Sequence, residues 1–263
     1  MLVRAVSATL LAVAALSAQA APVTPSYGSF GDLSGATFGG SGIPTNPTAS
    51  TTFAHVYAQD AFGGLLSTTI TLGLTAHQRY SNPALTNDGA GTYFATAGKN
   101  DGLDGGGHSV LATWNFGFYI NSSTGSLAQM MGGSHPLTFE LFYDTDPSVG
   151  TDFSDYGRVL FNAQASLLGN ASTLQDSWNL DMDFLNDGVS GSVFAPLVGF
   201  DPTVDGEYGF VLRTTDETGA SHNASILVKV GNPRTNNVPE PGTLALLGLA
   251  LAGLGVMRNR RKA

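Results

Sequence analysis

Apolar and polar residues alternate with a period of two along six runs of the chain. This period is typical of antiparallel strands that bury one face and expose the other. It predicts half-buried strands rather than helices. The apolar face positions of the six runs are Leu66, Ile70, Leu72 and Leu74; Val110, Ala112, Trp114, Phe116, Phe118 and Ile120; Leu137, Phe139, Leu141 and Tyr143; Trp178, Leu180, Met182 and Phe184; Tyr208, Phe210 and Leu212; and Ile226, Val228 and Val230.

Turn sequences separate these runs, among them Asn87-Asp88-Gly89, Asn186-Asp187-Gly188 and Thr218-Gly219. Asn-Gly and Asp-Gly steps favour the backbone conformations of tight turns. About eight to ten strands within one domain are typical of a two-sheet sandwich. The sequence therefore predicts an all-β fold: a single antiparallel β-sandwich, jelly-roll-like, over residues 51–231. One short helix is expected within residues 122–131.

The segments that flank the predicted sandwich have a different composition. Residues 21–50 are rich in Gly, Pro, Ser and Thr, which predicts an irregular lead-in containing one edge strand. Residues 232–242 contain Asn232-Pro233 and Pro239-Glu240-Pro241 and read as a linker. The sandwich is thus expected to connect to the C-terminal residues through a short extended segment.

The C-terminus combines an uncharged apolar run with a basic tail. Residues 243–257 are 15 residues without a charge, which as a helix would span roughly 22 Å, less than the ~30 Å hydrocarbon core. Basic side chains at a helix end reach the interface and hold that end in the cytoplasm. We therefore predict a transmembrane segment over residues 243–257 and a cytoplasmic tail over residues 258–263. The basic residues of this tail are Arg258, Arg260, Arg261 and Lys262.

The N-terminus has the organisation of a signal peptide. Residues 1–4 end in Arg4, residues 5–16 are apolar, and Ala18-Gln19-Ala20 fits the small-x-small cleavage pattern. We predict a signal peptide over residues 1–20, cleaved between Ala20 and Ala21. The predicted partners at this end are signal peptidase and the export machinery.

The C-terminal residues resemble the PEP-CTERM family of bacterial sorting substrates. The similarity lies in Pro239, Glu240 and Pro241, followed by a short apolar segment and an Arg-rich tail. The resemblance implies recognition by an exosortase, transient anchoring in the inner membrane, and delivery to the cell surface or extracellular matrix. It further implies a setting of exopolysaccharide and of biofilm or floc formation.

Charge narrows the class of partner. The chain holds 11 basic and 20 acidic residues, of which five basic residues (Arg4 and the four of the tail) and Glu240 lie in the targeting segments. The remaining 6 basic and 19 acidic residues give the exported part a formal charge of −13. Nucleic acid would be repelled by such a body. The chain contains no cysteine, so no disulfide supports the domain.

Four carboxylates form the main candidate metal site. Asp144, Asp146, Asp152 and Asp155 lie within 12 residues after the run that ends at Tyr143. Calcium takes six to eight oxygen ligands, so these side chains could converge on one ion. The alternative is a solvated acidic turn whose carboxylates cap local backbone N–H groups. A second acidic pair, Asp181 and Asp183, is expected on the outward face of its strand.

Three functions fit this sequence. The first is a non-enzymatic surface or matrix protein, because no nucleophile elbow, HExxH motif or P-loop occurs. The second is a carbohydrate-binding module that grips a glycan through exposed tyrosines and the acidic loop, with calcium as the candidate cofactor. The third is a polysaccharide-active enzyme with paired carboxylates in a cleft. The tyrosines considered for a glycan platform are Tyr27, Tyr57, Tyr80, Tyr93 and Tyr119, whereas Trp114 and Trp178 are assigned to the core by their alternation.

Overall fold

A computed structural model describes residues 23–39, 47–59, 62–79, 85–100 and 110–231. The predicted signal peptide with Ala20 and Ala21 lies outside these residues. The linker with its Pro-Glu-Pro motif, the apolar segment and the basic tail lie outside them as well.

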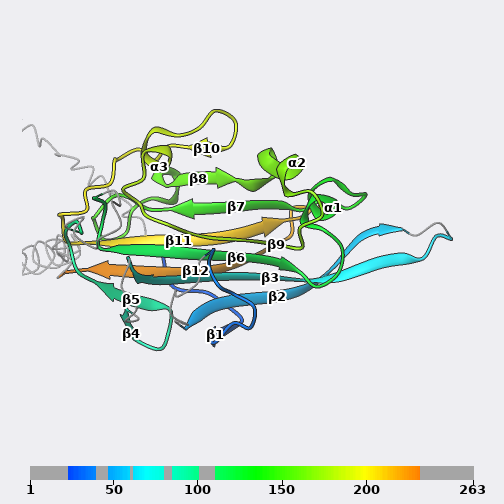
Figure 1. The fold of residues 1–263 in the computed structure, drawn as a ribbon, viewed down its shortest axis with the longest axis horizontal. Helices are drawn as coiled ribbons and strands as arrows, with labels where there is room; N and C mark the ends of the chain where they lie inside the picture. The colour runs from blue at the N-terminus through cyan, green and yellow to red at the C-terminus, as the bar shows by residue number, and fades with distance from the viewer. Residues whose placement is uncertain (1–22, 40–46, 60–61, 80–84, 101–109, 232–263) are drawn as a thin grey trace, which may run out of the picture.

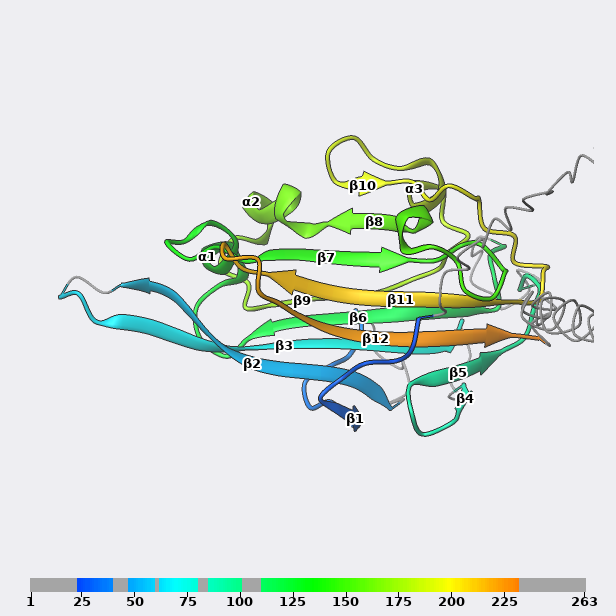
Figure 2. The same ribbon diagram turned by 180° about the vertical axis from the view of Figure 1, so that it is seen from behind.

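The described residues form two sheets packed face to face (Figures 1 and 2). The five-stranded sheet has the order β1-β2-β3-β6-β9, and the seven-stranded sheet has the order β10-β8-β7-β11-β12-β5-β4. Strands of the first sheet are β1 (Ser29–Gly31), β2 (Thr48–Gln59), β3 (Leu65–Gln78), β6 (Trp114–Ser122) and β9 (Thr173–Trp178). Strands of the second are β4 (Thr86–Asn87), β5 (Thr92–Ala95), β7 (Thr138–Tyr143), β8 (Gly157–Leu160), β10 (Val193–Phe194), β11 (Gly206–Thr215) and β12 (Ser221–Val230).

Short helices connect the strands at the periphery of the sandwich. They are α1 (Leu127–Gly132), α2 (Ala165–Leu168), α3 (Asp183–Asp187) and the 3₁₀ turns η1 (Phe153–Asp155) and η2 (Phe161–Gln164). The all-β prediction is confirmed. One detail of the antiparallel prediction is wrong, because β5 runs parallel to β12. The jelly-roll-like connection of the strands stays a prediction.

Aromatic side chains from both sheets fill the space between them. Phe116 of β6 and Phe210 of β11 have ring centroids 4.6 Å apart, although the two strands belong to different sheets. Trp114 packs between Tyr208 and Phe210 at 5.9 and 6.1 Å. The apolar faces predicted from the alternation thus meet in one core, and Trp114, Phe116 and Phe118 lie in it as expected.

The alternation fails at the ends of two predicted runs. Leu66 lies in the part of β3 near the hairpin turn and is 38% exposed, whereas Thr68, the polar interruption of that face, is buried. Thr68 tolerates burial because its Oγ1 makes a hydrogen bond of 2.9 Å with Ser122 Oγ. Val110 precedes β6 and is 50% exposed. Leu66 and Val110 thus lie at the outer ends of their predicted runs.

The strand predicted through Leu180, Met182 and Phe184 is wrong, because β9 ends at Trp178. The reason is the buried amide of Asn179, whose Nδ2 donates to the carbonyl oxygens of Ala112 (3.0 Å) and Trp114 (2.8 Å). These bonds turn the chain away from the sheet. Two further residues follow the turn: Asp181 pairs with Lys99 (Oδ2 to Nζ, 2.9 Å) and Asp183 begins α3, so neither lies on a strand face.

The helix expected within residues 122–131 is shorter than predicted. Ser122 still belongs to β6, and α1 begins at Leu127 after Ser126 caps it. Ser126 Oγ accepts from Gln129 N, and Gln129 Oε1 accepts from Ser126 N, which forms a capping box. The local start signal, the capping box at Ser126, was therefore present in the sequence four residues after the predicted start.

The lead-in contains the predicted edge strand, β1, which pairs with β2. It also covers part of the opposite sheet. Ser225 N donates to Ser26 O (2.8 Å) and Ser26 N donates to Ser225 Oγ (2.7 Å), so the lead-in occupies part of the β12 edge that β5 does not reach. Pairing of this kind protects a sheet edge against association with other chains.

The hairpin of β2 and β3 extends beyond the sandwich (Figures 1 and 2). Its outer part carries apolar side chains that face solvent: Phe62 is 97% exposed, and Leu65 is exposed as well. Nearer the body, Ile70, Leu72 and Leu74 of β3 are buried. The hairpin therefore changes from core strand to projecting arm along its length.

Gly157 offers a test of the packing between β7 and β8. A Cβ at this position would lie 2.2 Å from Cζ of Tyr143, whose ring is buried and whose hydroxyl donates to Leu185 O (2.7 Å). We expect Gly157→Ala to lower the free energy of unfolding by about 3 kcal/mol, because overpacking displaces a ring that has no room to move. Urea unfolding of the purified protein would measure the loss.

Gly132 is the matched control for this variant. An added Cβ there meets no atom within 4 Å, and Gly132 is the last residue of α1. Gly132→Ala should leave stability unchanged or raise it by up to about 1 kcal/mol. Equal stability of the two alanine variants would contradict the packing seen around Tyr143.

Candidate functional site

The acidic loop begins with a buried carboxylate. Asp144 directly follows β7 and is 3% exposed. Its backbone N donates to Gly209 O (2.9 Å), and its Oδ1 accepts from Asp146 N (3.0 Å). The loop thus starts inside the protein rather than at its surface.

Burial raises the pKa of Asp144 to about 7, and the neighbouring charge of Asp146 acts in the same direction. Hydrogen bonds from Asp146 N and from the side chains of Thr151 and Tyr156 partly oppose this increase. The Tyr156 hydroxyl in turn has a raised pKa, chiefly because it is buried and also because it lies beside Asp144. Asp144 is consequently a carboxyl group that holds its proton near neutral pH.

Two of the other three carboxylates of the loop, those of Asp146 and Asp152, cap local backbone N–H groups. Asp146 Oδ1 accepts from Ser148 N (2.8 Å), and Asp152 Oδ1 accepts from Ser154 N (2.9 Å). The Ser154 bonds lower the pKa of Asp152. Asp155 lies at the end of η1, with its Oδ1 at 3.5 Å from Ser154 Oγ.

The structure does not gather the four predicted calcium ligands into one cluster. Throughout the described part of the chain, no three His, Cys, Asp or Glu side chains meet in an arrangement that could hold a metal ion. The capping pattern matches the alternative interpretation of this loop as an acidic turn. Calcium binding by Asp144, Asp146, Asp152 and Asp155 stays a prediction, which melting temperatures in calcium and in chelator can test.

The tyrosine platform for a glycan is not formed by the residues considered for it. Tyr57, Tyr93 and Tyr119 are buried, and Tyr27 is half-buried beside Phe30 with ring centroids 5.5 Å apart. Tyr80 lies outside the described residues. The prediction is therefore wrong for the three buried tyrosines, whose rings contribute to packing.

Trp178 packs at the margin of the core. It is half-buried, with its ring centroid 4.7 Å from that of Phe118 and 5.2 Å from that of Phe184. Its Nε1 donates to Asp176 Oδ2 (2.9 Å). Trp178 packs against the core as predicted, but its indole is only half-buried, whereas that of Trp114 is buried.

Two histidines that are distant in the sequence meet at one end of the sandwich. His55 of β2 is buried, and burial lowers its pKa; the charges of Glu217 and Asp216 and a hydrogen bond to the backbone of His135 act in the opposite direction. His135 Nδ1 and Glu217 Oε1 are 2.8 Å apart. No sequence pattern linked these residues, because they come from β2, the α1–β7 connection and the β11–β12 turn.

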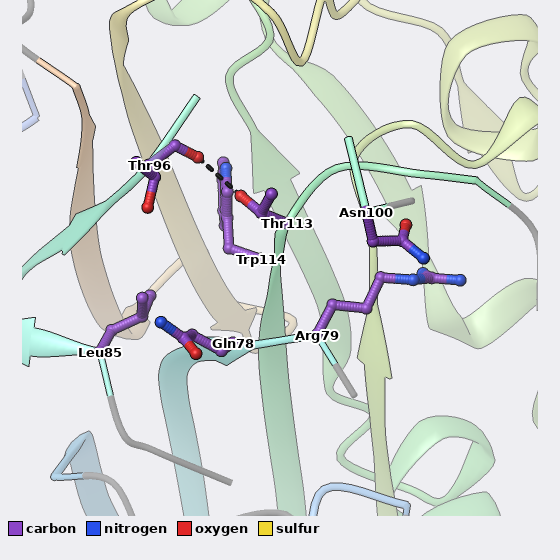
Figure 3. A pocket seen from close by; sticks show the side chains of 7 residues that line it. All are labelled: Gln78, Arg79, Leu85, Thr96, Asn100, Thr113 and Trp114. Atoms are coloured by element: carbon purple, nitrogen blue, oxygen red, sulfur yellow. Dashed lines mark hydrogen bonds between the residues drawn. The ribbon is translucent and has the colours of Figure 1, made fainter. Parts of the chain in front are cut away.

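A polar pocket of about 260 Å³ lies where β3 ends and β6 begins (Figure 3). Sequence analysis did not single it out, because its residues come from three separate segments. Leu85 forms an apolar wall of the pocket. Its other lining residues are Gln78, Arg79, Thr96, Asn100, Thr113 and Trp114.

Backbone hydrogen bonds hold these segments together. Arg79 N donates to Thr113 O (2.9 Å), and Thr113 N donates to Gly98 O (3.1 Å). Asn100 is fixed by two contacts with Leu111: its N donates to Leu111 O (2.9 Å), and its Oδ1 accepts from Leu111 N (2.8 Å). The pocket is therefore built on a hydrogen-bonded frame and not on isolated side chains.

The side chains of this pocket are rich in hydrogen-bond donors. Arg79 is 8% exposed. With the Asn100 amide oriented by Leu111, its Nδ2 is buried and has no hydrogen-bond partner within the described residues. In Figure 3 the side chains of Arg79 and Asn100 lie next to each other on one side of the pocket, and Gln78 lies on the other side beside Leu85. A ligand with acceptor oxygens would complement this lining.

None of the described helices is long and apolar enough to cross a membrane, and residues 243–257 lie outside the described part of the chain. Comparison with curated proteins and with solved structures found no match for this chain. The family comparison, in contrast, identifies the C-terminus. Residues 237–261 match the PEP-CTERM protein-sorting motif, and the chain therefore carries this sorting signal after its β-sandwich.

Proposed function

We propose that this protein is exported, processed by an exosortase and delivered to the cell surface or the extracellular matrix. The observation that carries the proposal is the PEP-CTERM protein-sorting motif at residues 237–261. The sequence of the N-terminus supports it independently, because residues 1–20 have the organisation of a cleaved signal peptide. The apolar segment and basic tail would anchor the protein in the inner membrane until processing.

Within the matrix, we propose a non-enzymatic role in exopolysaccharide-based biofilm or floc formation. The formal charge of −13 on the exported part supports solubility outside the cell. The two-sheet body supports a role in presenting surfaces to other matrix components. A carbohydrate-binding module is the alternative. A polysaccharide-active enzyme is a third and less favoured function, because it requires two carboxylates on opposite sides of a cleft.

The sorting motif can be tested in the cell. Replacing Pro239, Glu240 and Pro241 together with alanine should leave export intact and trap most of the protein in the inner membrane, because the apolar segment and basic tail still stop transfer. Cell fractionation and immunoblotting would measure this as a shift from surface to membrane fraction. The unprocessed protein should also run at higher mass.

Alanines at Asn232, Thr235 and Asn236 provide the matched control, since these residues lie in the same linker but before the matched segment. This control should reach the surface normally. Normal surface delivery of the Pro-Glu-Pro variant would contradict the proposed sorting. In the same strains, aggregate formation should fall with the trapped variant and not with the control, and unchanged aggregation would remove the matrix role.

A further inference from the structure

We infer that the outer face of the seven-stranded sheet binds an acidic polysaccharide through Arg158 and Arg213. The choice of this ligand rests on the proposed matrix role, which places the protein among exopolysaccharides. On this face the two arginines share one glutamate. Glu140 Oε1 lies 3.3 Å from Arg158 Nη1, and Glu140 Oε2 lies 2.8 Å from Arg213 Nη2.

Strand pairing places these side chains on the face that points away from the core. Successive side chains of a strand point to opposite faces, and the residues of the other parity in β7 and β11 form the core. Arg213 of β11 lies opposite Glu140 of β7. Two residues further along β7, Phe142 lies opposite Arg158 of β8, which in turn lies opposite Phe194 of β10. These five residues, here called the arginine strip, cross four neighbouring strands (Figure 1) and span roughly 14 Å at ~4.8 Å between strands.

The arginine strip carries more positive charge than its own glutamate requires. Glu207 and Lys229, on the same face, form the one-to-one pair that neutralisation alone needs (Oε2 to Nζ, 3.2 Å). Two arginines and one glutamate instead give the strip a formal charge of +1, whereas the exported part as a whole carries −13. The side chains of the two arginines are 37% and 34% exposed, against 9% for Glu140. The excess positive charge is therefore accessible from solvent.

Aromatic rings hold both guanidinium groups in place. Arg158 Cζ lies 4.2 Å from the ring centroid of Phe194, and Arg213 Cζ lies 4.4 Å from that of Phe142. Such stacking orders a guanidinium before a ligand arrives, which lowers the entropic cost of binding. Among the described residues each guanidinium makes one hydrogen bond, to Glu140. Because Arg213 Nε is buried, the Nη atoms of Arg213 are the donors that a ligand carboxylate would reach.

The acidic residues around the strip favour a ligand that runs across the strands. They lie at both ends of the strands, because the acidic loop follows β7, and Asp216 and Glu217 follow β11. An anion that runs along a strand would approach one of these ends, whereas an anion that runs across the strands lies between them. More distant acidic residues are screened, since the Debye length is about 8 Å at physiological ionic strength. The length of the strip exceeds one sugar ring and therefore suits a chain.

The side chains of the strip match sugar rings that carry carboxylates. Phe194 is 42% exposed at the β10 end of the strip, and its ring offers an apolar surface to the carbons of a sugar ring. Guanidinium groups bind carboxylates through charge-assisted hydrogen bonds. An acidic polypeptide would share these charges but lacks the sugar rings, which makes it the informative comparison.

Binding would be measured by calorimetry on the full chain in detergent, with polygalacturonate as the probe. Dextran, a polysaccharide without charge, and polyglutamate, an acidic chain without sugar rings, are the comparison ligands. We expect polygalacturonate to bind about tenfold more tightly than either. Raising the salt concentration should weaken this binding, because salt screens charges that are exposed.

Three variants of the strip separate ligand binding from a structural role. Arg158→Gln and Arg213→Gln should each weaken the binding of polygalacturonate about three- to fivefold, the scale of a partly exposed charge pair. Each of these variants leaves Glu140 paired with the other arginine, so both should fold. Glu140→Gln should have the opposite effect and tighten binding about threefold, because it removes the carboxylate that competes for both guanidinium groups.

Lys99→Gln is the matched control for the arginine variants. It removes one positive charge as they do, but Lys99 pairs with Asp181 outside the strip (Nζ to Oδ2, 2.9 Å). This control should bind polygalacturonate like the parent. A loss equal to that of the arginine variants would mean that net charge alone governs binding, which would overturn the proposed site.

Two further results would overturn the proposal. The first is parental affinity in both arginine variants, measured where their melting temperatures equal that of the parent. The second is binding of polyglutamate as tight as that of polygalacturonate, which would assign the strip to an acidic polypeptide. Both concern binding by the purified protein, whereas the sorting experiment measures location in the cell, so either experiment can fail without the other.

Discussion

Trp114→Ala is expected to lower the free energy of unfolding by about 3–5 kcal/mol, the usual cost of emptying a large aromatic site in a core. Trp114 is 2% exposed and contacts aromatic rings of the opposite sheet, Tyr208 and Phe210, and of the loop residue Phe200. Its removal would leave a cavity between the two layers. Urea unfolding followed by tyrosine fluorescence and circular dichroism would measure the change in midpoint.

Two further variants provide the comparison for the stability loss expected of Trp114→Ala. Trp178→Ala should cost less than Trp114→Ala, because the Trp178 indole is half-buried and part of its space remains open to water. Phe94→Ala, at a 43% exposed position of β5, should change stability by less than about 1 kcal/mol. If Trp114→Ala cost no more than Phe94→Ala, the two sheets would not pack as described.

The alternation of apolar residues predicted the central strands well, because burial against a second layer imposes a period of two. β7, β11 and β12 follow the runs at Leu137–Tyr143, Tyr208–Leu212 and Ile226–Val230. The same pattern failed after Trp178, where the apolar period continued but the Asn179 amide bonded to the backbone of the adjacent strand. A single buried polar residue thus outweighed the pattern, and its hydrogen-bond partners are more than 60 residues away.

The pairing of distant segments was beyond the reach of sequence patterns. The parallel contact of β5 with β12 and the lead-in bonds from Ser26 to Ser225 join residues whose separation carries no periodic signal. The pocket has the same origin, since Gln78, Thr96 and Thr113 come together through the pairing of β3 with β6 and through hydrogen bonds between loops. The sorting motif, in contrast, is contiguous, so its residues could be identified directly.

Asp144 shows a further limit of the sequence. The acidic character of its loop was plain, but the alternation could not indicate that this carboxyl group is buried while Asp152 is exposed and Asp155 is half-buried. Asp144 differs because it directly follows β7 and lies beside β11. Its backbone N donates to Gly209 O of that strand. Its environment therefore depends on the neighbouring strand.

Asp144→Asn is expected to stabilise the protein at alkaline pH and to have little effect at acidic pH. The pKa of Asp144 is about 7 in the folded protein, against 3.8 for the ordinary side chain. Between these values the folded state binds a proton that the unfolded state has lost, so stability falls as pH rises through this window. At 1.36 kcal/mol per unit, the full cost above pH 7 is about 4 kcal/mol at most. Asparagine is neutral at every pH and its Oδ1 can still accept from Asp146 N, as Asp144 does.

Titration of the histidines changes stability with pH in the opposite direction. The quantity to measure is therefore the difference in free energy of unfolding between variant and parent. Burial lowers the pKa values of His55 and His77, so each decreases stability as pH falls through about 6.5. Both residues are present in parent and variant, and their contributions cancel in the difference. Urea unfolding of both proteins from pH 4 to pH 8 gives the required series.

Asp152→Asn is a control of opposite sign in the same loop. Ser154 hydrogen bonds lower the pKa of Asp152, so its carboxylate stabilises the folded state above the ordinary pKa and loses that effect as pH falls. Asp152→Asn should therefore be less stable than the parent at neutral pH and should approach it in acid. The stability of Asp144→Asn relative to the parent should instead increase steadily from pH 4 to pH 8. A constant difference across this range would contradict the prediction, because it would mean that Asp144 has the same pKa in the folded and unfolded chains.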